Sequence, residues 1–279
     1  MSSNLNSLSI FGVSFPLIPF FGLSALLLIA IVNRILPSGV PGLVDRILSR
    51  VFVALVISRM VFVVQFRDQY FAAETPAFAM VDIRDRGFEP VAFLAVMALG
   101  LGHMLLREGA VRKPLIIMVT IALLWVGTGF SVFKYTHDTP EVWPQFSFND
   151  LTGKSLPLRS DLANITVVNL WATWCPTCRA EMPVFEQAQQ TYPHVRFVML
   201  NQGESRADVV RFLEAEEYQF DNVWLDPDAK MGRWLGQTAV PVTLVFGLDG
   251  ELLTGHTGVM SAATLSRLLS SESSSDLLN

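Results

Sequence analysis

The chain contains two cysteines, Cys175 and Cys178, and both lie in one Cys-Pro-Thr-Cys motif. Two cysteines at this spacing can form a reversible disulfide, which is the reacting group in thiol–disulfide exchange. A single pair excludes a disulfide-rich scaffold and a four-cysteine zinc site, because both need further cysteines. The alternative is an inert disulfide, but closing so short a loop stabilises a fold very little. We therefore expect redox chemistry at this pair.

The elements around the motif predict which cysteine reacts first. Residues 165–170 are β-branched and apolar, as in a buried strand, and a helix is expected over 176–191 with a kink at Pro183. Cys175 then lies at the helix N-terminus, where unpaired N–H groups and the helix dipole stabilise a thiolate. We expect Cys175 to be the nucleophile and Cys178 to resolve the mixed disulfide. A motif at such a strand-to-helix turn is typical of a thioredoxin-like domain.

A proline further along the chain supports this interpretation. Pro241 follows Val240 and directly precedes the apolar run 242–246. In a thioredoxin-like unit this proline is expected to be cis and to lie against the disulfide. A cis bond would leave the Val240 backbone free to pair with a substrate peptide. The alternative is an ordinary proline at the start of a strand.

The rest of residues 140–279 alternates between strand-like and helix-like segments, which predicts an α/β thioredoxin-like domain. Further strands are expected at 146–149, 155–158, 195–200, 223–225 and 251–255. Further helices are expected at 207–216, 228–235 and 262–269. The serine-rich tail after Ser270 is expected to be disordered.

Residues 1–139 form a second predicted domain of different composition. They carry eleven Lys and Arg and eight Asp and Glu, a net charge of +3, whereas residues 140–279 carry nine and seventeen, a net of −8. Four apolar runs predict an α-helical membrane domain of about four transmembrane helices, at 10–31, 51–66, 91–106 and 115–133. The acidic second half excludes nucleic-acid binding, because it would repel phosphate groups.

The segments between these runs predict the orientation. Segments 33–50 and 107–113 each carry three basic residues, whereas 67–89 balances three arginines with five acidic residues. Basic segments favour the cytoplasmic side, so the domain after the last run is expected outside the cytoplasm. Arg59 lies within the second run. We expect it to snorkel or to pair with an outer-loop carboxylate such as Asp82 or Glu89.

Segment 169–183, Asn-Leu-Trp-Ala-Thr-Trp-Cys-Pro-Thr-Cys-Arg-Ala-Glu-Met-Pro, resembles the TlpA/ResA/CcmG (DsbE-like) family of membrane-anchored thiol–disulfide oxidoreductases. The resemblance covers about residues 143–270. It implies that Glu181, three residues after Cys178, exchanges a proton with that thiol; a solvated helix residue is the alternative. We take the following as candidate substrate-binding residues near the motif: Trp174, Pro176, Thr177, Val240 and Pro241.

The resemblance also implies a location and partners. It implies a bacterial inner-membrane protein whose periplasmic domain reduces protein disulfides, with apocytochrome c and copper-site proteins among the family's substrates. No cofactor is expected beyond the Cys175–Cys178 disulfide. Because residues 1–139 contain no cysteine, a DsbD/CcdA-type membrane reductase is the expected electron donor. Val242 stands where cytochrome-maturation members carry an acidic residue, so the cytochrome c role stays open.

Two other functions stay open at this point. The same motif serves disulfide oxidases and isomerases, and Pro176-Thr177 does not decide the direction. The chain is alternatively a membrane scaffold whose thioredoxin-like domain docks a partner. Segments 58–66 and 83–90 also resemble part of a prolipoprotein diacylglyceryl transferase. This implies a truncated, inactive relative, because the family's His-Gly-Gly segment is absent.

Overall fold

The computed structural model describes residues 7–10, 13–35, 39–71, 80–136, 146–157, 165–236, 239–248 and 250–276. The chain divides into two compact units. One is formed by residues 17–137 and the other by residues 1–16 together with 138–279. Each unit has its own buried apolar clusters, so the two cores are independent of one another.

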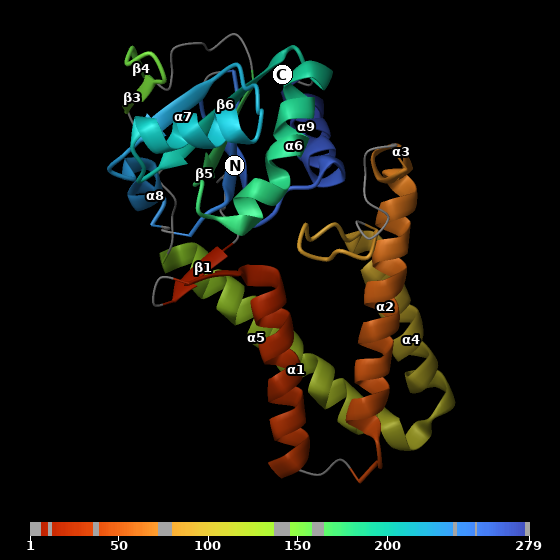
Figure 1. Ribbon diagram of the computed structural model, residues 1–279. Helices are drawn as coiled ribbons and strands as arrows, with labels where there is room; N and C mark the ends of the chain where they lie inside the picture. The colour runs from red at the N-terminus through yellow and green to blue at the C-terminus, as the bar shows by residue number, and fades with distance from the viewer. Residues whose placement is uncertain are drawn as a thin grey trace. The chain divides into compact units, whose positions relative to one another are not determined.

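Apolar helices make up the first unit (Figure 1). They are α1 (Leu17–Ile35), α2 (Leu43–Gln65), α4 (Pro90–Arg107) and α5 (Arg112–Thr136), with the short α3 (Arg67–Tyr70) and η2 (Gly109–Val111). Segments 43–65, 90–107 and 109–132 are long and apolar enough to cross a membrane, and the apolar helix at 20–35 is shorter. Large apolar side chains are exposed along these helices, which suits contact with lipid, among them Leu27, Phe52, Leu99 and Ile116.

The first apolar run begins differently from the prediction. A helix was predicted from residue 10, but β1 (Ser7–Ile10) and β2 (Val13–Pro16) form an antiparallel pair, and α1 begins at Leu17. A helix from residue 10 would hold Pro16 in its interior, where proline lacks the main-chain N–H that the helix needs and clashes with the preceding turn. A short apolar run fits a strand as well as a helix, so composition alone could not separate the two.

Arg59 of α2 is buried, and its guanidinium is fully engaged. It donates to a carboxylate oxygen of Asp85 at 3.0 Å. It also donates at 2.7–2.9 Å to three main-chain carbonyls, those of Met80, Asp82 and Gly87. The Tyr70 hydroxyl donates to the other oxygen of Asp85 at 2.9 Å. A buried charge needs such a set of partners, because each lost hydrogen bond would leave it uncompensated.

The predicted pairing of Arg59 with a carboxylate of the following loop is confirmed, but the carboxylate belongs to Asp85. The Asp82 side chain binds Arg84 instead, at 2.6 Å. The Glu89 side chain accepts a hydrogen bond from Val91 N at the start of α4. Local hydrogen bonds therefore occupy both of the carboxylates that the sequence suggested.

A seven-stranded sheet forms the centre of the second unit, in the order β4-β3-β7-β6-β5-β8-β9. Its strands are β3 (Ser147–Asp150), β4 (Ser155–Pro157), β5 (Ile165–Trp171), β6 (Val195–Gln202), β7 (Val223–Asp226), β8 (Val242–Phe246) and β9 (Leu252–Thr257). β5, β6 and β7 are parallel, and the other pairings are antiparallel. The central strands are buried on both faces, which explains their continuous apolar sequences.

Helices lie on both faces of this sheet (Figure 1). Apolar side chains of α6 (Pro176–Thr191), α7 (Arg206–Ala215) and α9 (Ala262–Asp276) share one buried cluster with Val167 and Trp171 of β5. The opposite cluster joins Val168 and Leu170 to Met231 of α8 (Lys230–Trp234). Alternate residues of β5 therefore face different helical layers. The predicted α/β thioredoxin-like architecture is confirmed.

The end of the chain departs from the prediction. Disorder was expected after Ser270, but α9 continues to Asp276. Serine has an intermediate helix propensity, and adding residues to an existing helix is far easier than nucleating one. Leu265 and Leu269 are buried, so packing of the first turns supplies that nucleus.

We predict that Asp85→Ala lowers the free energy of unfolding of the helical unit by about 3–5 kcal/mol, because it leaves the Arg59 charge buried without its carboxylate. Arg84→Ala is the matched control. It removes a surface pair with an exposed arginine, so the expected loss is under about 1 kcal/mol. Thermal unfolding of the full chain in detergent micelles measures both. Equal losses would contradict a special role for the buried pair.

Candidate redox site

The Cys-Pro-Thr-Cys motif lies where β5 passes into α6. Cys175 is the N-cap residue of α6, and its Sγ atom accepts a hydrogen bond from Cys178 N at 3.2 Å. Pro176 occupies the first helical turn, where its missing N–H costs nothing. The helix spans Pro176–Thr191, as the sequence predicted, with Pro183 inside it. The reacting sulfur is therefore held at the positive end of a helix.

The two cysteines form a disulfide, with their Cα atoms 5.3 Å apart. Cys175 is 3% exposed and Cys178 is fully buried. Trp174, directly before them, is 68% exposed, and Thr177 Oγ1 lies 3.2 Å from Cys175 Sγ. Cys175 is thus the more exposed sulfur of the pair, and the exposed Trp174 side chain precedes it in the sequence.

The second predicted segment lies beside the disulfide. The Val240–Pro241 peptide bond is cis, as the sequence suggested. The Val240 carbonyl oxygen is 3.7 Å from Cys175 Sγ. The Pro241 carbonyl accepts a hydrogen bond from Gly258 N at 3.0 Å, which ties the segment to the end of β9. Cys175 and Val240 are 65 positions apart in the sequence, and the structure brings the Val240 carbonyl next to the Cys175 sulfur.

Glu181 lies one helical turn after Cys178 on α6, and both side chains are fully buried. Asn169 Nδ2 of β5 donates to Glu181 Oε1 at 2.7 Å, and Met260 N donates to Oε2 at 2.8 Å. Burial raises the pKa of Glu181 to about 8, although these two hydrogen bonds lower it. The alternative of a solvated helix residue is therefore wrong. A carboxyl that titrates near neutral pH suits proton transfer.

Sequence reasoning paired Asn169 with Glu181 but missed two further residues of this hydrogen-bond network, Thr243 and Met260. Thr243 of β8 binds the Asn169 amide at 3.2 Å, and Met260 follows β9. Thr243 lies two residues after Pro241, in register with Asn169, so the strand pairing of a thioredoxin-like sheet could have indicated it. Met260 acts through its main-chain N–H, and its residue type carries no signal for that role.

A further carboxylate supports the turn before the motif. Glu204, two residues after β6, accepts hydrogen bonds from Thr173 N at 2.7 Å and from the Thr173 hydroxyl. Asn201 of β6 donates to the same carboxylate at 2.6 Å. Glu204 therefore links the ends of two parallel strands next to Cys175. In the sequence, the position of Glu204 shortly after a buried strand could have indicated this supporting role.

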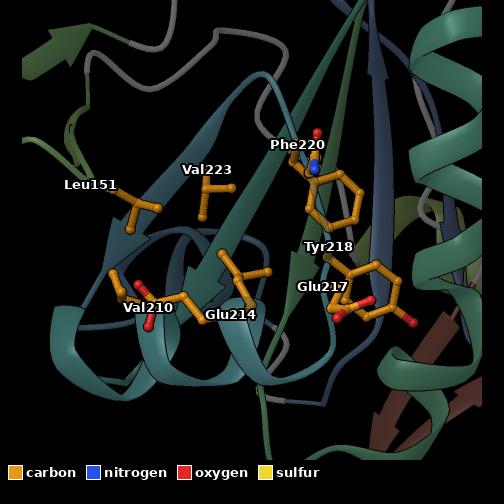
Figure 2. A pocket seen from close by; sticks show the side chains of 9 residues that line it. Leu151, Val210, Glu214, Glu217, Tyr218, Phe220 and Val223 are labelled. Carbon is orange, nitrogen blue, oxygen red and sulfur yellow. The ribbon is translucent and has the colours of Figure 1, made fainter.

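Figure 2 shows a hollow of about 650 Å³ elsewhere on the domain, between α7, the β3–β4 turn and the start of β7. Its lining residues include Leu151, Val210, Glu214, Tyr218 and Phe220. None of the predicted site residues lines it. Within the described ranges, no cluster of three His, Cys, Asp or Glu side chains could hold a metal ion.

Residues 139–270 match the Redoxin family model. The thiol–disulfide oxidoreductase ResA of Halalkalibacterium halodurans is 30% identical over 118 residues, which are 42% of this chain and 66% of ResA. The thiol:disulfide interchange protein DsbE of Allochromatium vinosum is 27% identical over 121 residues, which are 43% of this chain and 66% of DsbE. Residues 139–270 therefore form a Redoxin domain. Its relatives are thiol–disulfide oxidoreductases of the ResA/DsbE type, which supports the TlpA/ResA/CcmG family.

The matches leave part of each protein uncompared. The chain spans 66% of the length of both relatives, just under two thirds. The solved structure of MTB DsbF is 28% identical, with a TM-score of 0.41, and covers 46% of this chain and 94% of DsbF. The family match begins at residue 139, after α5, so it covers the ResA-like domain and none of the apolar helices.

We predict that Glu181→Gln flattens the pH dependence of stability. The pKa of Glu181 rises from its ordinary value of 4.5 to about 8 on folding, so between these values only the folded chain keeps this proton. The stability that the group contributes is full below pH 4.5. It is lost as the pH rises to about 8, by about 1.4 kcal/mol per pH unit.

Urea midpoints of the full chain in micelles, followed by near-ultraviolet circular dichroism, measure this effect. The wild-type midpoint should fall as the pH rises from about 5 to about 8, and the midpoint of Glu181→Gln should change less. Glu214→Gln, at an exposed carboxylate, should follow the wild type. Parallel curves for all three proteins would show that Glu181 is not protonated in the folded state.

Proposed function

We propose that this protein reduces disulfide bonds of other proteins on the periplasmic side of a bacterial inner membrane. The observation that carries the proposal is the position of Cys175 Sγ, which caps α6 and lies 3.7 Å from the Val240 carbonyl. The helix terminus stabilises a thiolate there, and a thiolate is the attacking species in disulfide exchange.

The reduction proceeds in two exchanges. The Cys175 thiolate attacks the substrate disulfide, forms a mixed disulfide and releases one substrate sulfur, which takes up a proton. The Cys178 thiol then loses its proton and attacks Cys175, which forms the intramolecular disulfide and releases the second substrate sulfur. Two electrons pass from the cysteine pair to the substrate. The disulfide present in the structure corresponds to the state after this turnover.

Glu181 supplies the proton chemistry of the second exchange. It is fully buried one helical turn from Cys178, and its raised pKa of about 8 lies close to the ordinary pKa of a thiol, so proton transfer from Cys178 to its carboxylate form costs little free energy. The substrate would lie over exposed Trp174 with Pro176 and Thr177 beneath it, and its backbone would pair with Val240 next to Pro241. No cofactor takes part besides the cysteine pair.

The apolar helices anchor the domain to the membrane in this proposal. Three of them are long and apolar enough to cross a bilayer, and the distribution of basic residues favours a periplasmic position for the domain. Both cysteines of the chain lie in the domain, so the helices cannot pass electrons by thiol exchange. A separate membrane reductase of the DsbD/CcdA type is therefore the electron donor. Apocytochrome c and copper-site proteins are the candidate substrates.

We predict that Cys178→Ser accumulates mixed disulfides with its substrates, because Cys175 still attacks but nothing resolves the product. Cys175→Ser is the matched control and should trap nothing and lose disulfide reduction. Non-reducing electrophoresis of membranes expressing each variant measures the adducts. Undiminished reduction by Cys175→Ser would refute the proposed role of this cysteine.

We predict a reduction potential of about −220 mV or lower for the Cys175–Cys178 pair, since a reductant must lie toward the thioredoxin end of the known range. Equilibration of the full chain with glutathione or dithiothreitol buffers, followed by thiol counting, gives this potential. A value near −120 mV is typical of a strong oxidant. It would reverse the proposed direction and indicate disulfide formation.

A further inference from the structure

One peptide group lies between Glu181 and His256. Its N–H belongs to Met260 and donates to Glu181 Oε2 at 2.8 Å. Its carbonyl belongs to Val259 and lies 3.2 Å from His256 Nε2. A carbonyl oxygen can only accept, so His256 Nε2 carries the proton in this contact. The imidazole and the carboxyl are thus hydrogen-bonded to opposite ends of the same amide.

The strand register places His256 in the same row as two residues near Glu181. His256 on β9 is in register with Thr243 on β8, and Thr243 is in register with Asn169 on β5. Thr243 binds the Asn169 amide, which in turn donates to Glu181 Oε1. This row of side chains across three strands therefore reaches Oε1 of the buried carboxyl through Asn169, while the Met260 amide binds Oε2. His256 is the member of this row that is partly open to solvent.

Hydrogen bonds through a peptide group strengthen one another. A donor on the carbonyl oxygen polarises the amide, and the N–H at the other end then donates more strongly. Donation to a carboxylate favours its charged form and opposes the effect of burial. His256 therefore acts on the proton equilibrium of Glu181 without touching it. An imidazolium would polarise the amide more than a neutral ring, and histidine ordinarily changes charge near pH 6.5.

The packing around Glu181 contains few competing charges. The buried members of the core cluster that α6 contributes to are apolar apart from the cysteine pair, and Tyr192 and Tyr218 pack against its edge. Buried polar neighbours on β5 and β8 are Asn169 and Thr243, which are neutral. α9 directs Leu265 and Leu269 into this core, while its Arg267 is partly exposed. After burial and the Asn169 hydrogen bond, the amide from the end of β9 is the remaining influence on the pKa of this carboxyl.

We propose that His256 is a positioning residue that sets the protonation of Glu181 through the Val259–Met260 peptide. The proposal deepens the function proposed above, since it concerns the carboxyl that receives the Cys178 proton. Losing His256 weakens the Met260 hydrogen bond and makes Glu181 a weaker acid. Glu181 then holds its proton to higher pH, and the resolving step shifts with it.

The test titrates Glu181 directly in the full chain in detergent micelles, by carboxyl carbon-13 NMR assigned with Glu181→Gln. We expect His256→Phe to raise the pKa of Glu181 by about one unit, because part of a charge-assisted hydrogen bond is lost. His256→Gln keeps a neutral N–H donor, so its shift should be less than about half as large. His194→Phe, at an exposed histidine beyond α6, is the matched control and should change nothing.

A second measurement uses the unaltered protein, so it does not depend on the folding of a variant. The Glu181 signal of wild type should show a second inflection at the pH at which the His256 ring signal titrates. An unmoved Glu181 pKa in His256→Phe, or the absence of the shared inflection, overturns the proposal. Trapping by Cys178→Ser tests the reductase function separately and would still succeed in that case.

Discussion

The hydrogen bond from Cys178 N to Cys175 Sγ is the interaction on which the rest of the site depends. It makes Cys175, the proposed nucleophile, the cap of α6, so the sulfur satisfies a backbone N–H that otherwise has no partner within the helix. β5 brings the chain to this point, and Glu204 holds the preceding turn through Thr173. A shift in any of these elements would move the sulfur away from the helix terminus that stabilises its charge.

The buried carboxyl places a second requirement on the fold. Glu181 has no contact with solvent, so the sheet must supply donors that a carboxyl would otherwise find in water. It receives them from β5, through Asn169, and from Met260 beyond β9. These segments are distant in sequence but close in the sheet, because only β8 separates β5 from β9. The antiparallel β8–β9 pair therefore serves the chemistry as well as the core.

The sequence predicted those parts of the site that depend on short-range patterns of residues. The motif, its helix over 176–191 and the segment at Pro241 follow from short-range patterns, and the structure contains them. Contacts made by main-chain atoms or across strands escaped prediction, as with Met260, because residue type does not determine them. The predicted helix start at residue 10 was wrong for a related reason, since a short apolar run does not show whether it pairs as a strand or joins the helix that follows. The sequence did not identify Asp85 as the partner of Arg59, because local hydrogen bonds engage the Asp82 and Glu89 side chains instead.

The buried Arg59 also has a consequence for how the chain is made. An arginine near the middle of an isolated apolar helix is costly to place in lipid, by about 2.5–3.5 kcal/mol on insertion scales. Its hydrogen-bond partners among the described residues lie between Met80 and Gly87, so they leave the ribosome after the arginine does. During biosynthesis α2 would therefore wait at the translocation machinery until this loop and α4 arrive, and the two helices would enter the bilayer as a hairpin.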